Sequence, residues 1–202
     1  GPEVEVMAVV KAEGYGHGAV ETAKTVLKQG AGWLGVSLPE EGLALRQAGI
    51  TAPILVFEPL QSGQTEVFIK NDLIATGCIW EAMTALALAA SQAGKKAPVH
   101  IKVDTGMGRI GINVNEAHAF ISKVSELPGL KVSGLYSHLA TADERNKSYA
   151  EKQIKIFSNL TESLKICGLL PEMVHLANSA AIIDLPGSYF NMVRPGIMLY
   201  GM

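Results

Sequence analysis

Near its start the chain contains Val6-Met7-Ala8-Val9-Val10-Lys11-Ala12-Glu13-Gly14-Tyr15-Gly16-His17-Gly18, an apolar run that ends in a lysine and passes into a glycine-rich turn. Five consecutive apolar residues bounded by such a turn indicate a strand buried on both faces. The segment after the turn, residues 19–29, has a helical period, and Gly30 ends it. The opening of the chain therefore predicts a strand, a polar turn and a helix, in that order.

The same order recurs along the rest of the chain. The apolar runs cover residues 6–11, 33–38, 53–57, 73–78, 99–104, 132–138, 173–178 and 192–200. The predicted helices cover residues 19–29, 41–47, 81–92, 115–127 and 146–166, with shorter ones near Phe68 and over residues 178–184. Ser37 and Glu40 have capping-box spacing ahead of the second helix. Strands that alternate with helices indicate a parallel sheet, and eight such strands close a (β/α)8 TIM barrel, which we favour over a doubly wound open sheet.

Composition narrows the function classes. Hydrophobic residues make up 48% and charged residues 18% of 202 residues, which fits one folded domain over residues 1–202. A net charge of −2 without a basic run gives nucleic-acid binding little support, and no apolar run reaches the ~20 residues of a membrane span. Cys78 and Cys167 have no CxxC partner, so we expect free thiols, with a single disulfide as the alternative, no metal site, and a cytoplasmic protein.

Lys11 is the first candidate for chemistry, because active sites of both architectures lie at the carboxyl ends of the strands. In the purely structural interpretation, the aliphatic part of the Lys11 side chain packs on apolar surface and its ammonium group reaches water. The glycines that follow favour a ligand approached closely by backbone N–H groups. A lysine amine in a pocket of low dielectric constant loses its proton more readily and can form a Schiff base.

The segment from Val9 to Gly18 resembles the lysine signature of the alanine racemase family, whose members are pyridoxal 5′-phosphate (PLP) enzymes of fold type III. The resemblance implies that Lys11 binds PLP covalently and that Tyr15 contacts the cofactor phosphate. Glu13 and Gly14 depart from the family's usual Asn or Asp followed by Ala, but neither position carries a reacting group.

The fifth run supplies a second cluster. Strand alternation places His100, Lys102 and Asp104 on one face and the apolar Ile101 and Val103 on the other. The apolar pair suits the helix side of a barrel, so we expect Lys102 to point inward. A buried lysine needs a partner, and an ion pair with Asp104 or a nearby glutamate is the structural alternative to a functional role.

The residues that follow, Gly106-Met107-Gly108-Arg109-Ile110-Gly111, also fit a GxGxxG dinucleotide fingerprint. That fingerprint needs an acidic residue at the end of the next strand, which here ends in Tyr136-Ser137-His138, so we disfavour it. The stretch resembles instead the racemase segment around the substrate-positioning arginine. The resemblance implies that Arg109 binds near the substrate carboxylate and that Lys102 is a candidate for carbamylation, which would make it an anion.

Polar residues also follow the sixth and seventh runs. His138 alone is more typical of a satisfied buried group than of a functional one. A helix beginning at Asn178 or Ser179 would present free N–H groups to a phosphate, and an ordinary N-cap is compatible with that role. The resemblance implies that His138 packs on the cofactor ring and that the Asn178-Ser179 motif belongs to the cofactor site, with the serine on the phosphate.

The last run contains Val193-Arg194-Pro195-Gly196-Ile197, which resembles the Arg-Pro-Gly-Ile/Leu motif of the same family. The resemblance implies that Arg194 faces the pyridine nitrogen and that the backbone of Gly196 and Ile197 helps to hold the phosphate. A surface ion pair is the structural alternative for Arg194, but the Pro-Gly pair after it favours a positioned turn.

The motifs resemble the family from residue 6 to residue 202 and imply racemisation of a small amino acid, L-alanine to D-alanine, for peptidoglycan. In the family the full enzyme begins upstream, forms a homodimer and has a C-terminal β domain whose tyrosine acts on the opposite face. We therefore expect these 202 residues alone to be weakly active or inactive. The alternatives are a serine/alanine racemase domain of a membrane-anchored protein, a non-catalytic PLP-binding homeostasis barrel, and a purely structural barrel.

Overall fold

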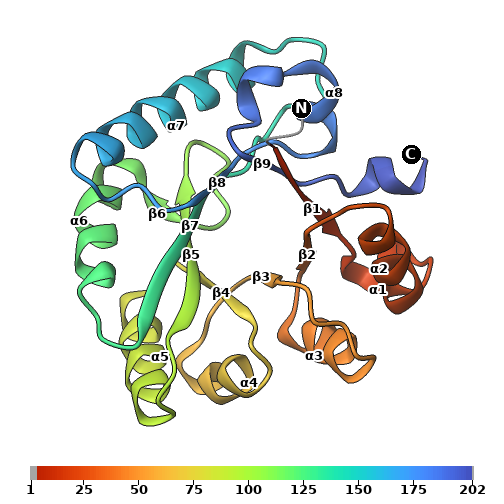
Figure 1. Ribbon diagram of the computed structural model, residues 1–202. Helices are drawn as coiled ribbons and strands as arrows, with labels where there is room; N and C mark the ends of the chain where they lie inside the picture. The colour runs from red at the N-terminus through yellow and green to blue at the C-terminus, as the bar shows by residue number, and fades with distance from the viewer. Residues whose placement is uncertain (1–3, 202) are drawn as a thin grey trace.

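A closed ring of eight parallel strands forms the centre of the computed structural model, which describes residues 4–201 (Figure 1). Residues 1–3 and 202, which belong to the expected domain 1–202, lie outside the described residues. The ring order is β4-β3-β2-β1-β9-β8-β7-β5, and pairing of β4 with β5 closes it. The strands are β1 (Glu5–Val9), β2 (Trp33–Val36), β3 (Ile54–Pro59), β4 (Ile74–Gly77), β5 (Ala97–Asp104), β7 (Leu130–Tyr136), β8 (Met173–His175) and β9 (Met192–Val193). The expected (β/α)8 barrel is confirmed.

The helices lie around the outside of this ring, as Figure 1 shows. They are α2 (Ala19–Lys28), α3 (Pro39–Gln47), α4 (Thr65–Lys70), α5 (Trp80–Gln92), α6 (Val114–Ser125), α7 (Ser148–Ile166) and α8 (Ser179–Asp184), with 3-10 turns η1 (Ser62–Gln64), η2 (Pro186–Ser188) and η3 (Ile197–Tyr200). Within residues 4–201, no helix has the length and apolarity to cross a membrane. Cys78 and Cys167 are both free.

Two local expectations were wrong. The run over residues 192–200 forms only the short β9, because Pro195 has no backbone N–H to donate and the chain then turns into η3. The capping carboxylate before α3 belongs to Glu41 rather than Glu40, since it accepts hydrogen bonds from the backbone N–H groups of Ser37 at 2.6 Å and Leu38 at 3.1 Å. Both differences arise at strand ends, where the cavity described below lies.

Strand residues alternate between two apolar layers. Ile101, Val103 and Leu135 are fully buried in the cluster that includes the apolar faces of the helices. Met7 and Tyr136 belong to a smaller cluster inside the ring. The expectation that Ile101 and Val103 face the helices is confirmed, so their neighbours in β5 point into the barrel.

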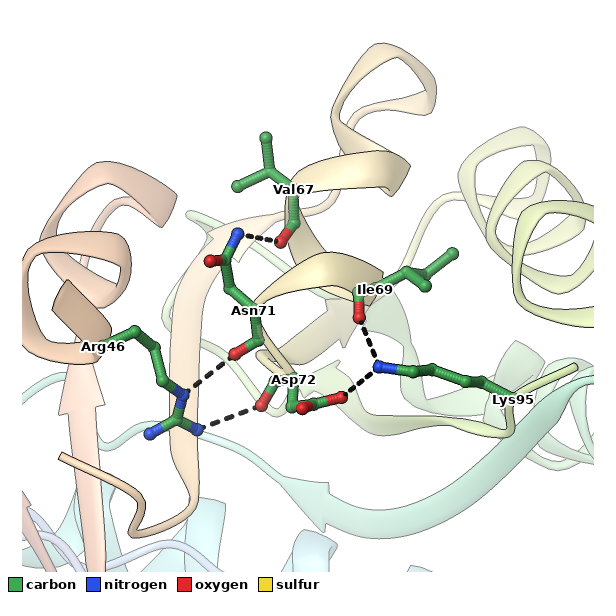
Figure 2. A network of polar contacts seen from close by, with 6 residues as sticks. All are labelled: Arg46, Val67, Ile69, Asn71, Asp72 and Lys95. Atoms are coloured by element: carbon green, nitrogen blue, oxygen red, sulfur yellow. Dashed lines mark hydrogen bonds and ion pairs between the residues drawn. The ribbon is translucent and has the colours of Figure 1, made fainter. Parts of the chain in front are cut away.

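The amino-terminal end of the barrel is tied together by two cations (Figure 2). Arg46 on α3 donates from Nε to the carbonyl oxygen of Asn71 at 2.9 Å and from Nη2 to that of Asp72 at 3.1 Å. Lys95 donates to the carbonyl oxygen of Ile69 at 3.0 Å and to Asp72 Oδ1 at 2.8 Å. These contacts satisfy carbonyl groups that the end of α4 leaves without helical partners. The contacts at this end of the barrel therefore stabilise the fold, and we expect the active site at the opposite, carboxyl-terminal end of the strands.

Candidate functional site

A cavity of about 630 Å³ opens among the loops that follow the strands, and its size suits a cofactor or small ligand. Its walls come from residues at the carboxyl ends of β1, β2, β3, β5, β7, β8 and β9 or in the loops that follow them. Every site residue predicted from the sequence lines it: Lys11, Tyr15, Lys102, Arg109, His138, Asn178, Ser179, Arg194, Gly196 and Ile197. The structure thus gathers residues that are up to 186 positions apart in the chain (197 − 11) around one space.

Lys11 stands at the start of a left-handed turn, α1 (Lys11–Tyr15), directly after β1. Ala12, Glu13 and Gly14 have φ values of 50°, 55° and 59°, and Tyr15 has a φ of 51°. Each non-glycine residue in this conformation costs roughly 1–2 kcal/mol. The glycines of the motif therefore do not explain the turn, because three of these four residues carry a Cβ atom. Strain of this kind persists only where the surrounding structure imposes it.

The carboxylate of Glu41 holds this turn in place. Its Oε1 accepts a hydrogen bond from the backbone N–H of Ala12 at 2.7 Å, while Oε2 binds the N–H groups of Ser37 and Leu38. One side chain on α3 therefore links the loop after β1 to the loop after β2. Sequence reasoning missed this role, although an acid in the first turn of a helix after a strand was a usable signal.

Hydroxyl and N–H groups converge at one corner of the cavity. The Ser179 hydroxyl accepts hydrogen bonds from the backbone N–H groups of Gly196 at 2.9 Å and Met198 at 3.4 Å. A Cβ atom on Gly196 would lie 3.0 Å from the Tyr15 hydroxyl, so the glycine is what lets these groups approach. Burial raises the pKa of Tyr15, which keeps its hydroxyl protonated and able to donate.

Asn178 acts as the N-cap of α8, because its Oδ1 accepts a hydrogen bond from the N–H of Ala181 at 3.1 Å. The capping interpretation made from the sequence is therefore confirmed. Asn178 nevertheless lines the cavity beside Ser179, and Ile197 lines it from the start of η3.

Arg194 is buried, with only 4% of its surface exposed, so the surface ion pair considered from the sequence is wrong. Its Nη1 contacts His175 Nδ1 at 2.9 Å. Its Nη2 contacts the carbonyl oxygens of Ser137 at 2.8 Å and Leu176 at 3.1 Å, and His138 Nδ1 at 3.2 Å. Among residues 4–201, these contacts engage both terminal nitrogens and none of them involves Nε, and Arg194 also lines the cavity. Burial lowers the pKa of Arg194 to about 10, which keeps it charged at neutral pH.

His138 is a neutral hydrogen-bonding wall of the cavity. Burial and the nearby Arg194 charge lower its pKa to about 2. Because a guanidinium only donates, His138 Nδ1 accepts and the ring proton resides on Nε2.

Lys102 points into the barrel, as expected, with its Nζ 4.6 Å from the centroid of the Tyr136 ring. The expected ion-pair alternative with Asp104 is not found: none of the ion pairs within residues 4–201 includes Lys102. Burial, followed by the charges of Arg194 and Arg109, lowers the pKa of Lys102 well below its usual value. A buried amine that gives up its proton readily is a good nucleophile for carbon dioxide.

Asp104 instead organises the loop that carries Arg109. Its carboxylate accepts hydrogen bonds at 2.8 Å from the N–H groups of Gly106, Met107 and Gly108. The loop then enters the two-residue strand β6 (Ile112–Asn113), which pairs with the end of β5. A dinucleotide fingerprint would open a helix at this point, so that interpretation is excluded.

Tyr136 was not predicted from the sequence, although it lines the cavity. Its hydroxyl lies 2.7 Å from Thr76 Oγ1, and its ring stacks on His175 at a centroid distance of 4.8 Å. Strand alternation back from His138 gave a usable signal, because residues two apart share a face.

The family of this chain follows from a comparison with known protein families, in which one family matches the whole sequence. The family model for the N-terminal domain of alanine racemase matches residues 1–202. The chain belongs to the alanine racemase family. It is 45% identical over 202 residues to an alanine racemase of Halothermothrix orenii and 43% identical over 202 residues to one of Methanococcus maripaludis. These matches cover 100% of the chain and 53% and 54% of the two relatives.

Solved alanine racemases have the same fold. The Clostridium difficile 630 enzyme in complex with cycloserine superposes with a TM-score of 0.96 at 39% identity, over 99% of this chain and 55% of that one. The Bacillus anthracis enzyme with bound L-Ala-P superposes with a TM-score of 0.90 at 40% identity, over 100% of this chain and 52% of that one. The chain therefore spans about half the length of the alanine racemases it matches.

Proposed function

We propose that the chain binds PLP through Lys11 and forms the cofactor-binding half of an alanine racemase. The observation that carries the proposal is the single 630 Å³ cavity, lined by a lysine after the first strand, hydroxyl groups after the first and seventh barrel strands, and a buried cation after the last. The names of the relatives support alanine as the amino acid and D-alanine as the product. Supply of D-alanine for peptidoglycan belongs to the same proposal.

The residues present fit PLP. Lys11 would bind the aldehyde, and the corner formed by Tyr15 and Ser179 suits the phosphate, because both hydroxyls can donate hydrogen bonds and the Gly196 backbone holds the Ser179 hydroxyl in place. Arg194 would face the pyridine nitrogen from its place after the last strand. When bound, PLP supplies an electron sink that makes the α-proton of an amino acid acidic.

The protein's own residues direct the proton transfer. Lys11 accepts the Cα proton on one face of the substrate and returns a proton to that face in the reverse direction. Arg194, with its pKa at about 10, stays cationic and does not give a proton to the ring nitrogen. A fixed cation at that position disfavours protonation of the ring nitrogen and so favours simple proton transfer over transamination or decarboxylation.

Arg109 is proposed to bind the substrate carboxylate, since its planar fork matches two carboxylate oxygens. Lys102 is proposed to add carbon dioxide: its amine nitrogen bonds to the carbon, one N–H proton leaves to water, and a carbamate anion remains. That anion would compensate the cationic surroundings created by Arg109 and Arg194. Incubation with 13C-labelled bicarbonate and carbon NMR should detect one carbamate signal, which Lys102→Met removes.

The proton donor on the opposite face is proposed to come from outside these 202 residues, because the chain spans about half the length of its relatives. A homodimer of the whole enzyme is part of this proposal. A small amino acid is the proposed substrate.

The decisive test is an absorbance titration with PLP. We expect a band near ~420 nm, a property of the cofactor bound to an amine, that Lys11→Ala abolishes and Lys24→Ala leaves unchanged. Lys24 is a matched control because it lies on α2 with 54% of its side chain exposed. A band that survives in Lys11→Ala contradicts the proposal.

A further inference from the structure

Two histidines continue the polar contacts of Arg194 into the interior of the barrel. His175 on β8 and His100 on β5 are both fully buried. His175 Nδ1 lies 2.9 Å from Arg194 Nη1, and His175 Nε2 lies 2.9 Å from His100 Nδ1. His100 Nε2 is buried and has no hydrogen-bond partner among residues 4–201. Three side chains, one on β5, one on β8 and one directly after β9, thus form one row of polar contacts.

Only one distribution of protons satisfies this row. A guanidinium donates and never accepts, so His175 Nδ1 must accept from Arg194. A neutral His175 then carries its proton on Nε2 and donates it to His100 Nδ1, which leaves the His100 proton on Nε2. Burial favours the neutral form of both rings: it lowers the pKa of His100 to about 3 and that of His175 well below its usual value. The nearby charges of Arg194 and Lys102 act in the same direction on His175.

The backbone fixes the position of the His100 ring. A Cβ atom on Gly134, the neighbouring residue on β7, would lie 2.4 Å from His100 Cγ, so the imidazole occupies space that any other residue would fill. The Trp33 ring lies on a further side at a centroid distance of 5.6 Å. A ring held this closely cannot turn to offer its other nitrogen to His175.

We infer that His100 is a positioning residue: by accepting the Nε2–H hydrogen bond of His175 it holds the His175 ring in the orientation whose Nδ1 receives the Arg194 guanidinium, and this aims the guanidinium at the cavity. The part of the inference that concerns PLP binding rests on the proposed function, whereas the part that concerns the hydrogen bonds of Arg194, His175 and His100 does not. Because Arg194 can only donate, every hydrogen bond in the row runs in the same direction, from Arg194 to His175 to His100. The Nε2–H of His100 stands at the end of the row and is therefore left without an acceptor among residues 4–201.

The tautomers can be measured directly. In the 202-residue chain labelled with 15N-histidine, long-range 1H–15N spectra should show His175 and His100 as neutral Nε2–H tautomers from pH 5 to 8. In His100→Asn an amide oxygen replaces the accepting Nδ1, and His175 should keep its tautomer. In His100→Leu the acceptor is lost, so the His175 Nε2–H proton should exchange faster with water and its signal should move upfield, although Arg194 still keeps His175 in the Nε2–H tautomer.

The cofactor readout adds a second measurement. His100→Leu should weaken PLP binding about tenfold, the scale of losses when a supporting partner is removed, whereas His100→Asn should stay within about twofold. A His175 tautomer with its proton on Nδ1 in the wild-type chain overturns the inference even if no variant folds. If the wild-type tautomers are as stated but no Lys11-dependent PLP band forms, the proposed function fails and the positioning inference stands.

Discussion

The Glu41 carboxylate lies 2.7 Å from the backbone nitrogen of Ala12, so a helix after the second strand holds the strained turn that follows the first. The same carboxylate binds the N–H groups of Ser37 and Leu38. Because each bond ends on a charged acceptor, it contributes more than a neutral hydrogen bond does. The orientation of Lys11 thus depends on a residue that lies outside its own motif.

Replacing Glu41 should therefore affect both stability and cofactor binding. We expect Glu41→Ala to lower the free energy of unfolding by about 2 kcal/mol, since three N–H groups lose a charged acceptor, and to weaken PLP binding by about tenfold. Urea denaturation and absorbance titration measure the two effects. Glu40→Ala is the matched control, because Glu40 is exposed in the same helical turn. Equal behaviour of the two variants would contradict the role of Glu41.

Replacing Arg46 should affect stability alone. Its guanidinium donates hydrogen bonds to four carbonyl oxygens at the amino-terminal end of the barrel: those of Ile50, Ala52, Asn71 and Asp72. We expect Arg46→Leu to lower the free energy of unfolding by about 2 kcal/mol, with PLP affinity of the folded protein unchanged. Arg145→Leu, at an exposed position, is the control. A loss of PLP affinity in Arg46→Leu would show that the two ends of the barrel are coupled.

Gly196→Ala should weaken PLP binding without a large loss of stability. The new methyl group would lie 3.0 Å from the Tyr15 hydroxyl and displace it from the corner proposed for the phosphate. We expect a rise of about tenfold in the dissociation constant, which corresponds to about 1.4 kcal/mol. Gly187→Ala is the control, because a methyl group there meets no atom within 4 Å. An unchanged dissociation constant in Gly196→Ala would show that the phosphate does not bind at this corner.

Stability should fall in acid because of buried neutral histidines. His100, His138 and His175 have pKa values lowered from 6.5 by burial, so below pH 6.5 the unfolded chain binds protons that the folded chain does not. Their contribution is complete above pH 6.5 and is lost as the pH falls toward 3, by up to about 1.4 kcal/mol per histidine for each pH unit. Urea denaturation between pH 7 and 4 measures the slope. The variant His100→Asn should reduce that slope, and an identical slope would count against the assignment.

The 202-residue chain alone should racemise L-alanine slowly or not at all, even when it binds PLP. Lys11 is proposed to serve one face of the substrate, and the proposed donor for the other face lies outside these residues. Loss of optical rotation from L-alanine measures turnover, and exchange of the Cα proton with deuterium from solvent measures removal by Lys11 alone. Exchange without racemisation is the expected outcome. Rapid racemisation by this chain would refute the one-face assignment.

The sequence predicted the residues whose position follows from strand order, and it missed those set by tertiary contacts. Lys11, His138 and Arg194 come at or just after apolar runs, so barrel geometry alone brings them to one end. Gly134 acts through His100 on another strand, which no local pattern specifies, and the first-turn position of Glu41 was a visible signal although its hydrogen bond to Ala12 was not. The left-handed turn of Lys11–Tyr15 is a similar case, because the intrinsic preferences of alanine, glutamate and tyrosine oppose it.

Pairing of β1 with β9 places Val6 beside Val193 and joins the first strand of the barrel to the last. Lys11 and Arg194 follow these two strands, so they become neighbours only when the ring shuts. Contacts between such distant parts of a chain form late in folding and slowly. During synthesis on the ribosome, a chain whose β9 has not yet emerged should therefore have no place for the cofactor, and affinity for it should appear in a single step with completion of the barrel.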